Sequence, residues 1–333
     1  MSTEIKTTVV GSYPLPEWLR ALPSSINVRD AAMVVMKTQE LAGIDVISDG
    51  ELSRFDINHP ETNGMIDYFI RPMSGIQSDL SRGELESFRA KSDFEFRAKP
   101  AGVVTEAIGE GTLNLLDDYE IVKSLTTCPL KFTVTSPYML ARTLVDNHHA
   151  DLEQLVLALG DVLAQQISGI DAAVLQVDEA NLPGRPQDGL IAAAGINRIL
   201  AAFNGETGVH LCFGNYGGQS IQRGHFEELM PFFNALECDH LILEFARRGY
   251  EELDVFQDLK PSIALGLGVI DIKDNGVETA EEVARRVEGA VKTLGADRIQ
   301  WIHPDCGFWM LHRSVADRKM HALVAGRNLY LGK

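Results

Sequence analysis

The chain has 333 residues, of which 45% are hydrophobic, and it carries a formal net charge of -17 at pH 7. This length and apolar content allow a sizeable core, in one large domain or in two smaller ones. So strong a negative charge argues against nucleic acid and anionic membrane surfaces as partners. The composition is that of a soluble enzyme.

The cellular setting is expected to be the cytoplasm. The first residues, Met1 to Lys6, are polar and show no apolar signal segment, and no window approaches the roughly 18 uninterrupted apolar residues of a membrane span. Thiols stay reduced in that compartment. The cysteines are therefore expected to be ligands or core residues rather than disulfide partners; they are Cys128, Cys212, Cys238 and Cys306.

Short apolar runs alternate with helical patterns along most of the chain. The runs begin near residues 7, 45, 131, 172, 209, 241, 262 and 298. Helices are predicted over 28–41, 151–167, 189–203, 226–236, 279–294 and 315–328. Uninterrupted apolar runs are typical of strands that are buried on both faces. The alternation favours an α/β fold, a (β/α)8 TIM barrel forming one domain over 1–333, and a doubly wound open sheet is the alternative.

The alternation of apolar runs and helical patterns stops after the second predicted strand. Residues from about 52 to 130 are expected to form an insertion, and its part from 74 to 99 is rich in Gly, Ser, Arg and Glu. Two short extended runs, 101–105 and 120–123, are predicted to pair as an antiparallel excursion. The insertion is interpreted as a lid or a wall of the functional site.

The stretch from Gly208 to Asn215 contains the first candidate metal ligands. Its predicted strand, 209–213, carries an imidazole at His210 and a thiol at Cys212. Side chains alternate between the faces of a strand, so these two point the same way and can hold one metal ion. The other interpretation is a core histidine beside a small buried cysteine.

Two later stretches strengthen the metal interpretation. Glu244 breaks an apolar run near the end of the next predicted strand, and Cys306 lies just past the end of a later one. In a barrel of parallel strands these positions meet His210 and Cys212 at one rim. Two thiolates, one imidazole and one carboxylate form a plausible zinc set.

The proposed ligands favour thiol chemistry over hydrolysis. Three negative ligand charges leave a zinc ion electron-rich, which suits it poorly for generating hydroxide but well for holding an incoming thiol as a thiolate. Further carboxylates stand at the ends of other predicted strands. Among them, Glu51 and Asp178 are candidates for binding a cationic substrate group such as an ammonium.

Several short motifs, taken in order, resemble one known family. They are Val-Gly-Ser-Tyr-Pro at 10–14, Asp-Gly-Glu at 49–51, Gln-Val-Asp-Glu at 176–179, His-Leu-Cys at 210–212, Glu244, and Pro-Asp-Cys-Gly at 304–307. Together they resemble the catalytic domain of cobalamin-independent methionine synthase over about residues 7 to 330. The resemblance implies a zinc-containing barrel that transfers a methyl group to homocysteine. It also implies that His210, Cys212, Glu244 and Cys306 bind the zinc and that Ser12, Glu51 and Asp178 hold the amino-acid end of the substrate.

The chain departs from the family at three places. It has no room for the additional N-terminal barrel of full-length members, so it resembles the short, stand-alone branch. The tryptophan-bearing stretch near the folate site is replaced by 135–138, Thr-Ser-Pro-Tyr. The family's Asp-Ile-His after the seventh strand reads Asp271-Ile272-Lys273 here. The half of the site that binds zinc and thiol is therefore intact, whereas the half that binds the methyl donor is altered.

These observations lead to one main expectation and two alternatives. We expect a zinc-dependent methyltransferase that makes methionine from homocysteine, with methyltetrahydrofolate or a methylated corrinoid protein as the donor. The first alternative is a zinc-dependent alkyltransferase acting on another thiol such as coenzyme M. The second is a zinc-binding barrel without catalysis, which would not need the ammonium-binding carboxylates Glu51 and Asp178.

Overall fold

The computed structural model describes residues 4–90, 97, 99–215 and 223–333. Its central feature is a parallel sheet in the order β1-β10-β9-β8-β7-β6-β4. The strands are β1 (Lys6–Thr7), β4 (Lys131–Thr135), β6 (Val174–Glu179), β7 (Glu206–Leu211), β8 (His240–Leu243), β9 (Ala264–Ile270) and β10 (Ile299–Pro304). Apart from β1, neighbours in the sheet follow one another along the chain. The order does not reverse in the middle, as it does in a doubly wound sheet.

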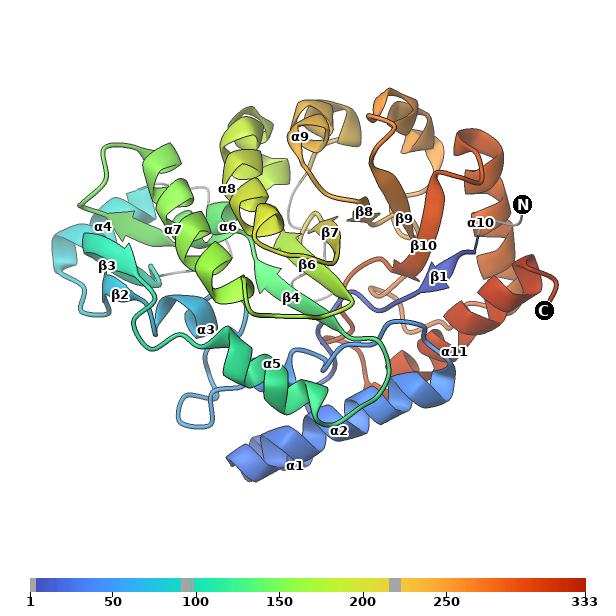
Figure 1. The fold of residues 1–333 in the computed structure, drawn as a ribbon, viewed down its shortest axis with the longest axis horizontal. Coiled ribbons are helices and arrows are strands. Elements are labelled where there is room, and N and C mark those ends of the chain that lie inside the picture. The colour runs from blue at the N-terminus through green and yellow to red at the C-terminus, as the bar shows by residue number, and fades with distance from the viewer. Residues whose placement is uncertain (1–3, 91–96, 98, 216–222) are drawn as a thin grey trace.

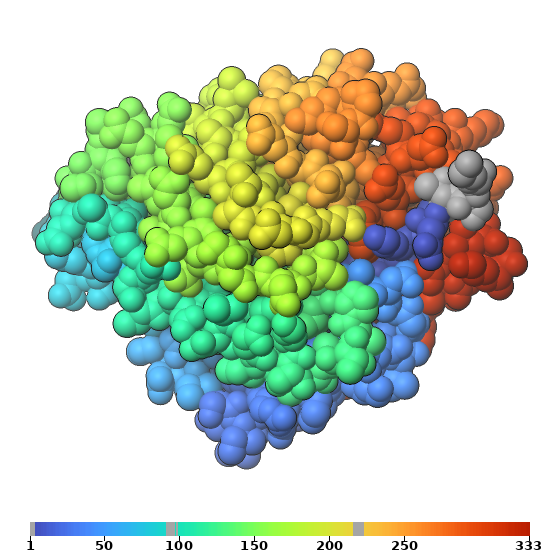
Figure 2. Space-filling model, in the orientation of Figure 1, coloured from blue at the N-terminus to red at the C-terminus, as the bar shows by residue number. Residues whose placement is uncertain are grey.

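The sheet is curled, so the first strand lies beside the last. β1 pairs in parallel with β10, and Lys6 stands opposite Trp301. The second predicted strand, near residue 45, is present only as isolated parallel bridges that join Thr8 to Val46 and Ile47 to Leu130. In Figure 2 the blue N-terminal residues lie directly against the red C-terminal elements.

Helices surround the outside of the curled sheet (Figure 1). They are α1 (Glu17–Ala21), α2 (Ser25–Ala42), α6 (Pro137–Ala141), α7 (Leu152–Ile167), α8 (Gly189–Ala201), α9 (Met230–Ala235), α10 (Ala280–Leu294) and α11 (Arg313–Tyr330). Short 3-10 turns occur at η1 (Leu52–Arg54), η2 (Leu182–Gly184), η3 (Pro186–Asp188), η4 (Phe226–Leu229) and η5 (Glu251–Asp258). The predicted helix over 226–236 therefore begins as a 3-10 turn and becomes α9.

The ends of the long helices follow from local sequence signals. Thr279 and Glu282 form a reciprocal capping box at the start of α10, which satisfies two backbone N–H groups that the helix leaves unpaired. Gly43 ends α2 with a φ of 82°, a left-handed conformation that glycine adopts without steric cost. Every residue of β9 is buried, as expected for a strand that is covered on both faces.

Two strands of the predicted insertion and one strand that follows it form a second, smaller sheet. The strands are β2 (Ser74–Gln77), β3 (Gly102–Gly109) and β5 (Leu144–Asp146), and the helices of the predicted insertion are α3 (Asp67–Ile70), α4 (Arg82–Ala90) and α5 (Leu115–Lys123). β2 runs antiparallel to β3, whereas β3 runs parallel to β5, which follows the insertion in the chain. Part of the polar stretch, 91–96 and 98, lies outside the described residues.

Of the two extended runs predicted inside the insertion, one is confirmed and one is wrong. Residues 102–105 fall within β3, but 120–123 lie in helix α5. Asn114 caps this helix by accepting a hydrogen bond from the amide of Asp117, and Leu115, Tyr119 and Val122 are buried. That spacing of four and three residues is helical, and it outweighs the β-propensity of Ile121 and Val122.

In the part of the chain that the structure describes, no helix has both the length and the apolarity that crossing a bilayer requires.

Candidate active site

Three side chains of metal-binding type meet at the carboxyl-terminal ends of β7 and β10: His210 within β7, Cys212 directly after it, and Cys306 after β10. One ligand atom each from His210, Cys212 and Cys306 lie within 4.8 Å of one another. β8 and β9 separate these two strands in the sheet. Because neighbouring strands lie about 4.8 Å apart, a flat sheet would hold β7 and β10 about 14 Å from each other. The curl of the sheet therefore brings the three side chains together.

The imidazole of His210 is oriented with one nitrogen left free. Its Nδ1 lies 2.9 Å from the carbonyl oxygen of Ile242. Since a carbonyl oxygen only accepts, Nδ1 carries the hydrogen and Nε2 keeps its lone pair. Nε2 is buried and makes no hydrogen bond to any described residue. A backbone carbonyl that fixes the tautomer in this way is typical of histidines that bind metal ions.

The two thiols lie close enough to affect each other. The interaction with the neighbouring Cys306 thiol, together with burial, raises the pKa of the Cys212 thiol well above its ordinary value. A buried thiol of this kind stays protonated unless a cation stabilises the thiolate. All four cysteines of the chain are free, and Cys128 and Cys238 are not part of the cluster.

Glu244 follows β8 directly and is completely buried. Its Oε1 makes no hydrogen bond to any described residue, while its Oε2 lies 3.3 Å from Nζ of Lys273. Glu244 is not within the 4.8 Å limit that encloses the other three residues. Burial opposes the charge of Lys273, yet Glu244, Cys306 and Cys212 raise the pKa of its ammonium group. Lys273 therefore pairs with the carboxylate of Glu244, and negative charge on the two thiols favours its ammonium form.

Asp305 anchors the chain beside Glu244. Its carboxylate accepts hydrogen bonds from the backbone amides of Phe245, Ala246 and Arg247 at 3.0, 2.8 and 2.7 Å. Burial and the negative charge of Glu244 nonetheless raise the pKa of this carboxyl group to about 7. The residue before Cys306 thus fixes the turn that follows Glu244.

Ser12 lies against the turn that follows Cys306, and Glu51 packs against Gly11, the residue before Ser12. The carbonyl of Ser12 accepts a hydrogen bond from the amide of Phe308 at 2.7 Å. A Cβ atom on Gly307 would lie 2.0 Å from Oγ of Ser12, and one on Gly11 would lie 2.3 Å from Oε1 of Glu51. Both glycines are therefore required for the close approach of the polar side chains.

The backbone at Glu51 is strained. This residue has a φ of 60°, the one positive φ outside glycine among the described residues. The left-handed conformation costs a residue with a Cβ about 1 to 2 kcal/mol. Such strain is concentrated at functional sites, where the surrounding structure holds the residue in place.

Asp178, which forms an acidic pair with Glu51, lies next to a member of the thiol cluster. It stands directly opposite His210 in the pairing of β6 with β7. Its Oδ1 accepts a hydrogen bond from Nε2 of Gln176 at 2.6 Å, and its Oδ2 makes none to the described residues. Burial raises the pKa of both Asp178 and Glu51, and the charge of Asp178 adds to the shift of Glu51. A cationic group bound between these carboxylates would relieve their repulsion.

Arg54, which was not predicted from the sequence as a site residue, lies beside this acidic pair. Its Nη1 lies 3.5 Å from Oε1 of Glu51, and both side chains are nearly inaccessible to solvent. Its Nη2 donates to the carbonyl and the hydroxyl of Thr133. The signal was present in the sequence, because an acid and a base three residues apart meet when the chain forms a helical turn.

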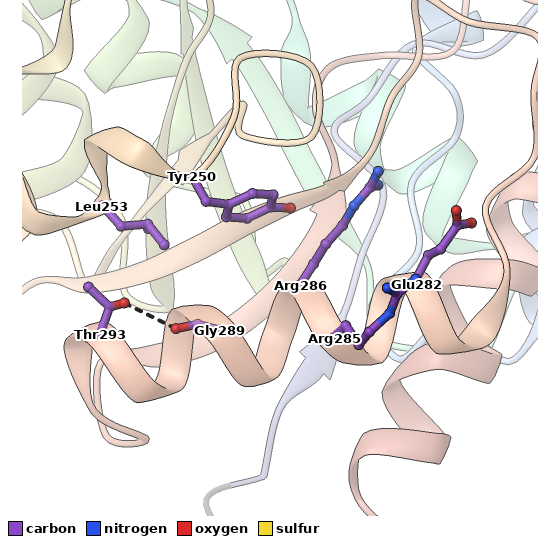
Figure 3. Close-up of a pocket in the computed structure, with 7 residues that line it drawn as sticks. All are labelled: Tyr250, Leu253, Glu282, Arg285, Arg286, Gly289 and Thr293. Carbon is purple, nitrogen blue, oxygen red and sulfur yellow. Dashed lines mark hydrogen bonds between the residues drawn. The ribbon is translucent and has the colours of Figure 1, made fainter.

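A separate hollow of about 450 Å³ lies on the outer helical layer, between α10 and the start of η5. Figure 3 shows Tyr250 and Leu253 facing Glu282, Arg285 and Arg286 across it. None of its lining residues belongs to the cluster of His210, Cys212 and Cys306. We assign it no function.

The fold and the cluster define a class: a curled α/β enzyme scaffold whose strand ends carry imidazole, thiol and carboxylate groups suited to a soft or borderline metal ion. Over residues 5–327 the chain matches the model of the family described as "Cobalamin-independent synthase, Catalytic domain". It belongs to this family, which confirms the resemblance found in its motifs.

Curated relatives and solved structures agree with this membership. A methionine synthase of Saccharolobus solfataricus is 27% identical over 340 residues, covering 97% of this chain and 93% of the relative. One of Sulfolobus acidocaldarius is 29% identical over 342 residues, covering 97% and 91%. A solved structure described as a B12-independent methionine synthase from Shewanella sp. W3-18-1 in complex with selenomethionine has a TM-score of 0.81 at 22% identity, covering 99% of this chain and 98% of that one. This last likeness concerns the fold.

Proposed function

We propose that this protein is a zinc-dependent methyltransferase that moves a methyl group to the thiol of homocysteine and so makes methionine. The observation that carries the proposal is the convergence of His210, Cys212 and Cys306 within 4.8 Å. The family membership and the relatives named methionine synthase support the reaction class.

The residues present fit a zinc ion. Nε2 of His210 and Oε1 of Glu244 are buried donor atoms that make no hydrogen bond to any residue in the described part of the chain. Together with the sulfur atoms of Cys212 and Cys306 they offer the nitrogen, sulfur and oxygen donors that zinc prefers. We therefore propose His210, Cys212, Glu244 and Cys306 as the ligands. When bound, zinc would hold the substrate sulfur as a thiolate.

The acidic pair of Glu51 and Asp178 is the proposed site for the amino-acid end of the substrate. Glu51 and Asp178 would accept hydrogen bonds from its ammonium group, and Ser12 would bind its carboxylate. Support comes from the raised pKa values of both acids: the charge of Arg54 lowers them, but burial outweighs it, so a further cation would stabilise the two carboxylates. Asp178 stands opposite His210 in the pairing of β6 with β7, so the proposed ammonium site would lie one strand away from the proposed thiol site.

The methyl donor is proposed at the level of two candidates, methyltetrahydrofolate and a methylated corrinoid protein. The family description, cobalamin-independent synthase, gives no support to the corrinoid partner. Methyltetrahydrofolate is therefore the first donor to test.

We also propose that the sheet closes into a complete (β/α)8 barrel within one domain over 1–333, with 52–130 as its insertion. The proposal is supported by hydrogen bonds on both sides of residues 46–47. The amide of Val46 donates to the carbonyl of Thr7 at 3.2 Å, and the amide of Lys131 donates to the carbonyl of Ile47 at 2.8 Å. This segment would then be the eighth strand, between β1 and β4.

The test is direct. Zinc-loaded protein is incubated with homocysteine and either methyltetrahydrofolate or a methylcorrinoid, and methionine is measured. The expected result is methionine from one donor, dependent on zinc. Coenzyme M replaces homocysteine in a parallel reaction. Alkylation of coenzyme M alone would favour the other alkyltransferase, and no product with any thiol or donor would favour a zinc-binding barrel without catalysis.

A further inference from the structure

Lys273 forms a buried ion pair inside the candidate active site. Its Nζ lies 3.3 Å from Oε2 of Glu244, and the exposed fractions of the two side chains are 2% and 0%. Burying two charges costs much of their attraction, so such a pair is weak evidence for a role in stability. The contact of Lys273 with Glu244, one of the proposed zinc ligands, calls for a different explanation.

The ion pair places the two carboxylate oxygens of Glu244 in different surroundings. Oε2 is held by Lys273, whereas Oε1 is buried and has no hydrogen-bond partner among the described residues. Only Oε1 is therefore available as a donor atom. A carboxylate fixed in this way presents one oxygen to a metal ion rather than two.

The turn that carries Lys273 is fixed from outside the sheet. The amide of Lys273 donates to Oδ1 of Asp271 at 2.8 Å, and the amide of Asp271 donates to Oε1 of Glu278 at 2.8 Å. Oε2 of Glu278 lies 2.9 Å from Nζ of the fully buried Lys319 on α11. Arg247 reaches the other oxygen of Asp271 at 3.3 Å. These contacts hold the turn without the help of any ligand.

The negative charge of the proposed zinc ligands explains why a cation is needed beside them. Two thiolates and one carboxylate exceed the charge of one zinc ion by one negative unit, and a substrate thiolate adds a second. In a buried site this accumulation disfavours the incoming anion. The ammonium group of Lys273, beside Glu244, reduces this excess negative charge by one unit both before and after the substrate thiolate binds.

We propose that Lys273 is a positioning residue that holds Glu244 as a one-oxygen ligand and supplies the positive charge that lets the site accept a substrate thiolate. This inference rests on the proposed function. It predicts that removing the charge at position 273 weakens binding through the substrate's sulfur and leaves binding of its amino-acid end unchanged.

The test uses the full chain loaded with zinc and measures equilibrium binding by calorimetry. Lys273→Met removes the charge and the hydrogen bond, Lys273→Gln removes the charge but keeps a donor, and Lys273→Arg keeps the charge. Exposed Lys292, on α10, gives the control Lys292→Met. Each protein is titrated with homocysteine and with 2-aminobutyrate, which has the same amino-acid end and no thiol.

The expected result is one zinc per chain in every variant, with homocysteine bound about 10-fold more weakly by Lys273→Met and Lys273→Gln. Lys273→Arg should recover most of the affinity, and 2-aminobutyrate should bind all variants alike. The inference would be overturned if the neutral variants kept wild-type affinity for homocysteine, lost equal affinity for homocysteine and 2-aminobutyrate, or lost their zinc. If either Lys273→Met or Lys273→Gln does not fold, the measurement on the other variant is used. Wild-type protein that binds neither zinc nor homocysteine would instead reject the proposed function.

Discussion

The carboxylate of Asp305 accepts a hydrogen bond from the backbone amide of Phe245 at 3.0 Å, so the turn after β10 is tied directly to the turn after β8. Two candidate ligands flank this contact, because Glu244 precedes Phe245 and Cys306 follows Asp305. β9 lies between the two strands and permits the contact through Gly268, where a Cβ atom would lie 2.3 Å from Oδ1 of Asp305. The distance between the two ligands thus depends on one side chain.

Replacing Asp305 with alanine should weaken both the fold and the metal site. Hydrogen bonds to a charged group contribute about 1.5 to 3 kcal/mol each, and three backbone amides lose their acceptor. We expect a loss of about 3 kcal/mol in the free energy of unfolding, measured by denaturant titration, together with weaker zinc binding. Exposed Asp297 supplies the control Asp297→Ala, which should change neither. Wild-type zinc affinity in Asp305→Ala would show that the turn does not set the ligand distance.

Replacing Cys306 with serine should remove zinc from the protein. The hydroxyl is a poor substitute for a thiolate at a zinc ion, so elemental analysis should find well below one zinc per chain. Zinc affinity of the wild type should also fall as the pH is lowered, because the pKa of the Cys212 thiol is raised and the proton competes with the metal. Cys128→Ser is the matched control and should keep its zinc. Full zinc content in Cys306→Ser would place the site elsewhere.

Glu51→Gln and Asp178→Asn should keep zinc but bind homocysteine more weakly. Each variant loses a charged hydrogen-bond partner of the ammonium group in a closed site, which costs about 2 to 4 kcal/mol of binding free energy. Burial raises the pKa of both carboxyl groups, but Glu51→Gln also removes the carboxylate partner of the buried Arg54, so the unfolding free energy of each variant would be measured as well. Calorimetric affinities and metal content would be measured on the same samples. Homocysteine affinities equal to wild type in both variants would remove these residues from the substrate site.

Binding of the thiol should release a proton. Homocysteine is mostly protonated at neutral pH because a thiol has a pKa of about 8.5, and a metal site binds it as the thiolate. Calorimetry in buffers of different ionisation enthalpy should therefore report about one proton released per site at pH 7, and fewer as the pH rises through the thiol pKa. Zinc-edge X-ray absorption should show one additional sulfur ligand. An unchanged metal shell under saturating homocysteine would reject transfer through the metal.

The cysteines should differ sharply in their reaction with iodoacetamide. Burial raises the pKa of Cys238 to about 12, so this residue has almost no thiolate at pH 7 or at pH 9. Half-buried Cys306 should be alkylated in zinc-free protein and protected by zinc, whereas half-buried Cys128 should react in both states. Peptide mass spectrometry measures each site separately. Rapid labelling of Cys238 in folded protein would contradict its burial.

Much of the fold follows from periodicity alone. Alternating apolar runs and helical patterns predicted the parallel strands β4 and β6 to β10 and the helices α2, α7, α8, α10 and α11 within a few residues. Such patterns depend only on neighbours along the chain. The prediction for 120–123 was wrong because a side-chain cap at Asn114 and the burial of Tyr119 decided the conformation. The second strand of the pattern is reduced to bridges at Val46 and Ile47.

The sequence by itself also determined which residues are candidates for the chemistry, since polar side chains at the ends of apolar runs are conspicuous. Only the tertiary structure decided which of them meet. The curl of the sheet joins Cys306 to His210 and Cys212. Lys273 reaches Glu244 because α11 fixes its turn, and Arg54 reaches Glu51 through the turn η1. The physical reason is that a periodic pattern specifies the direction of each side chain from its own strand, whereas the distance between strand ends depends on packing over the whole sheet.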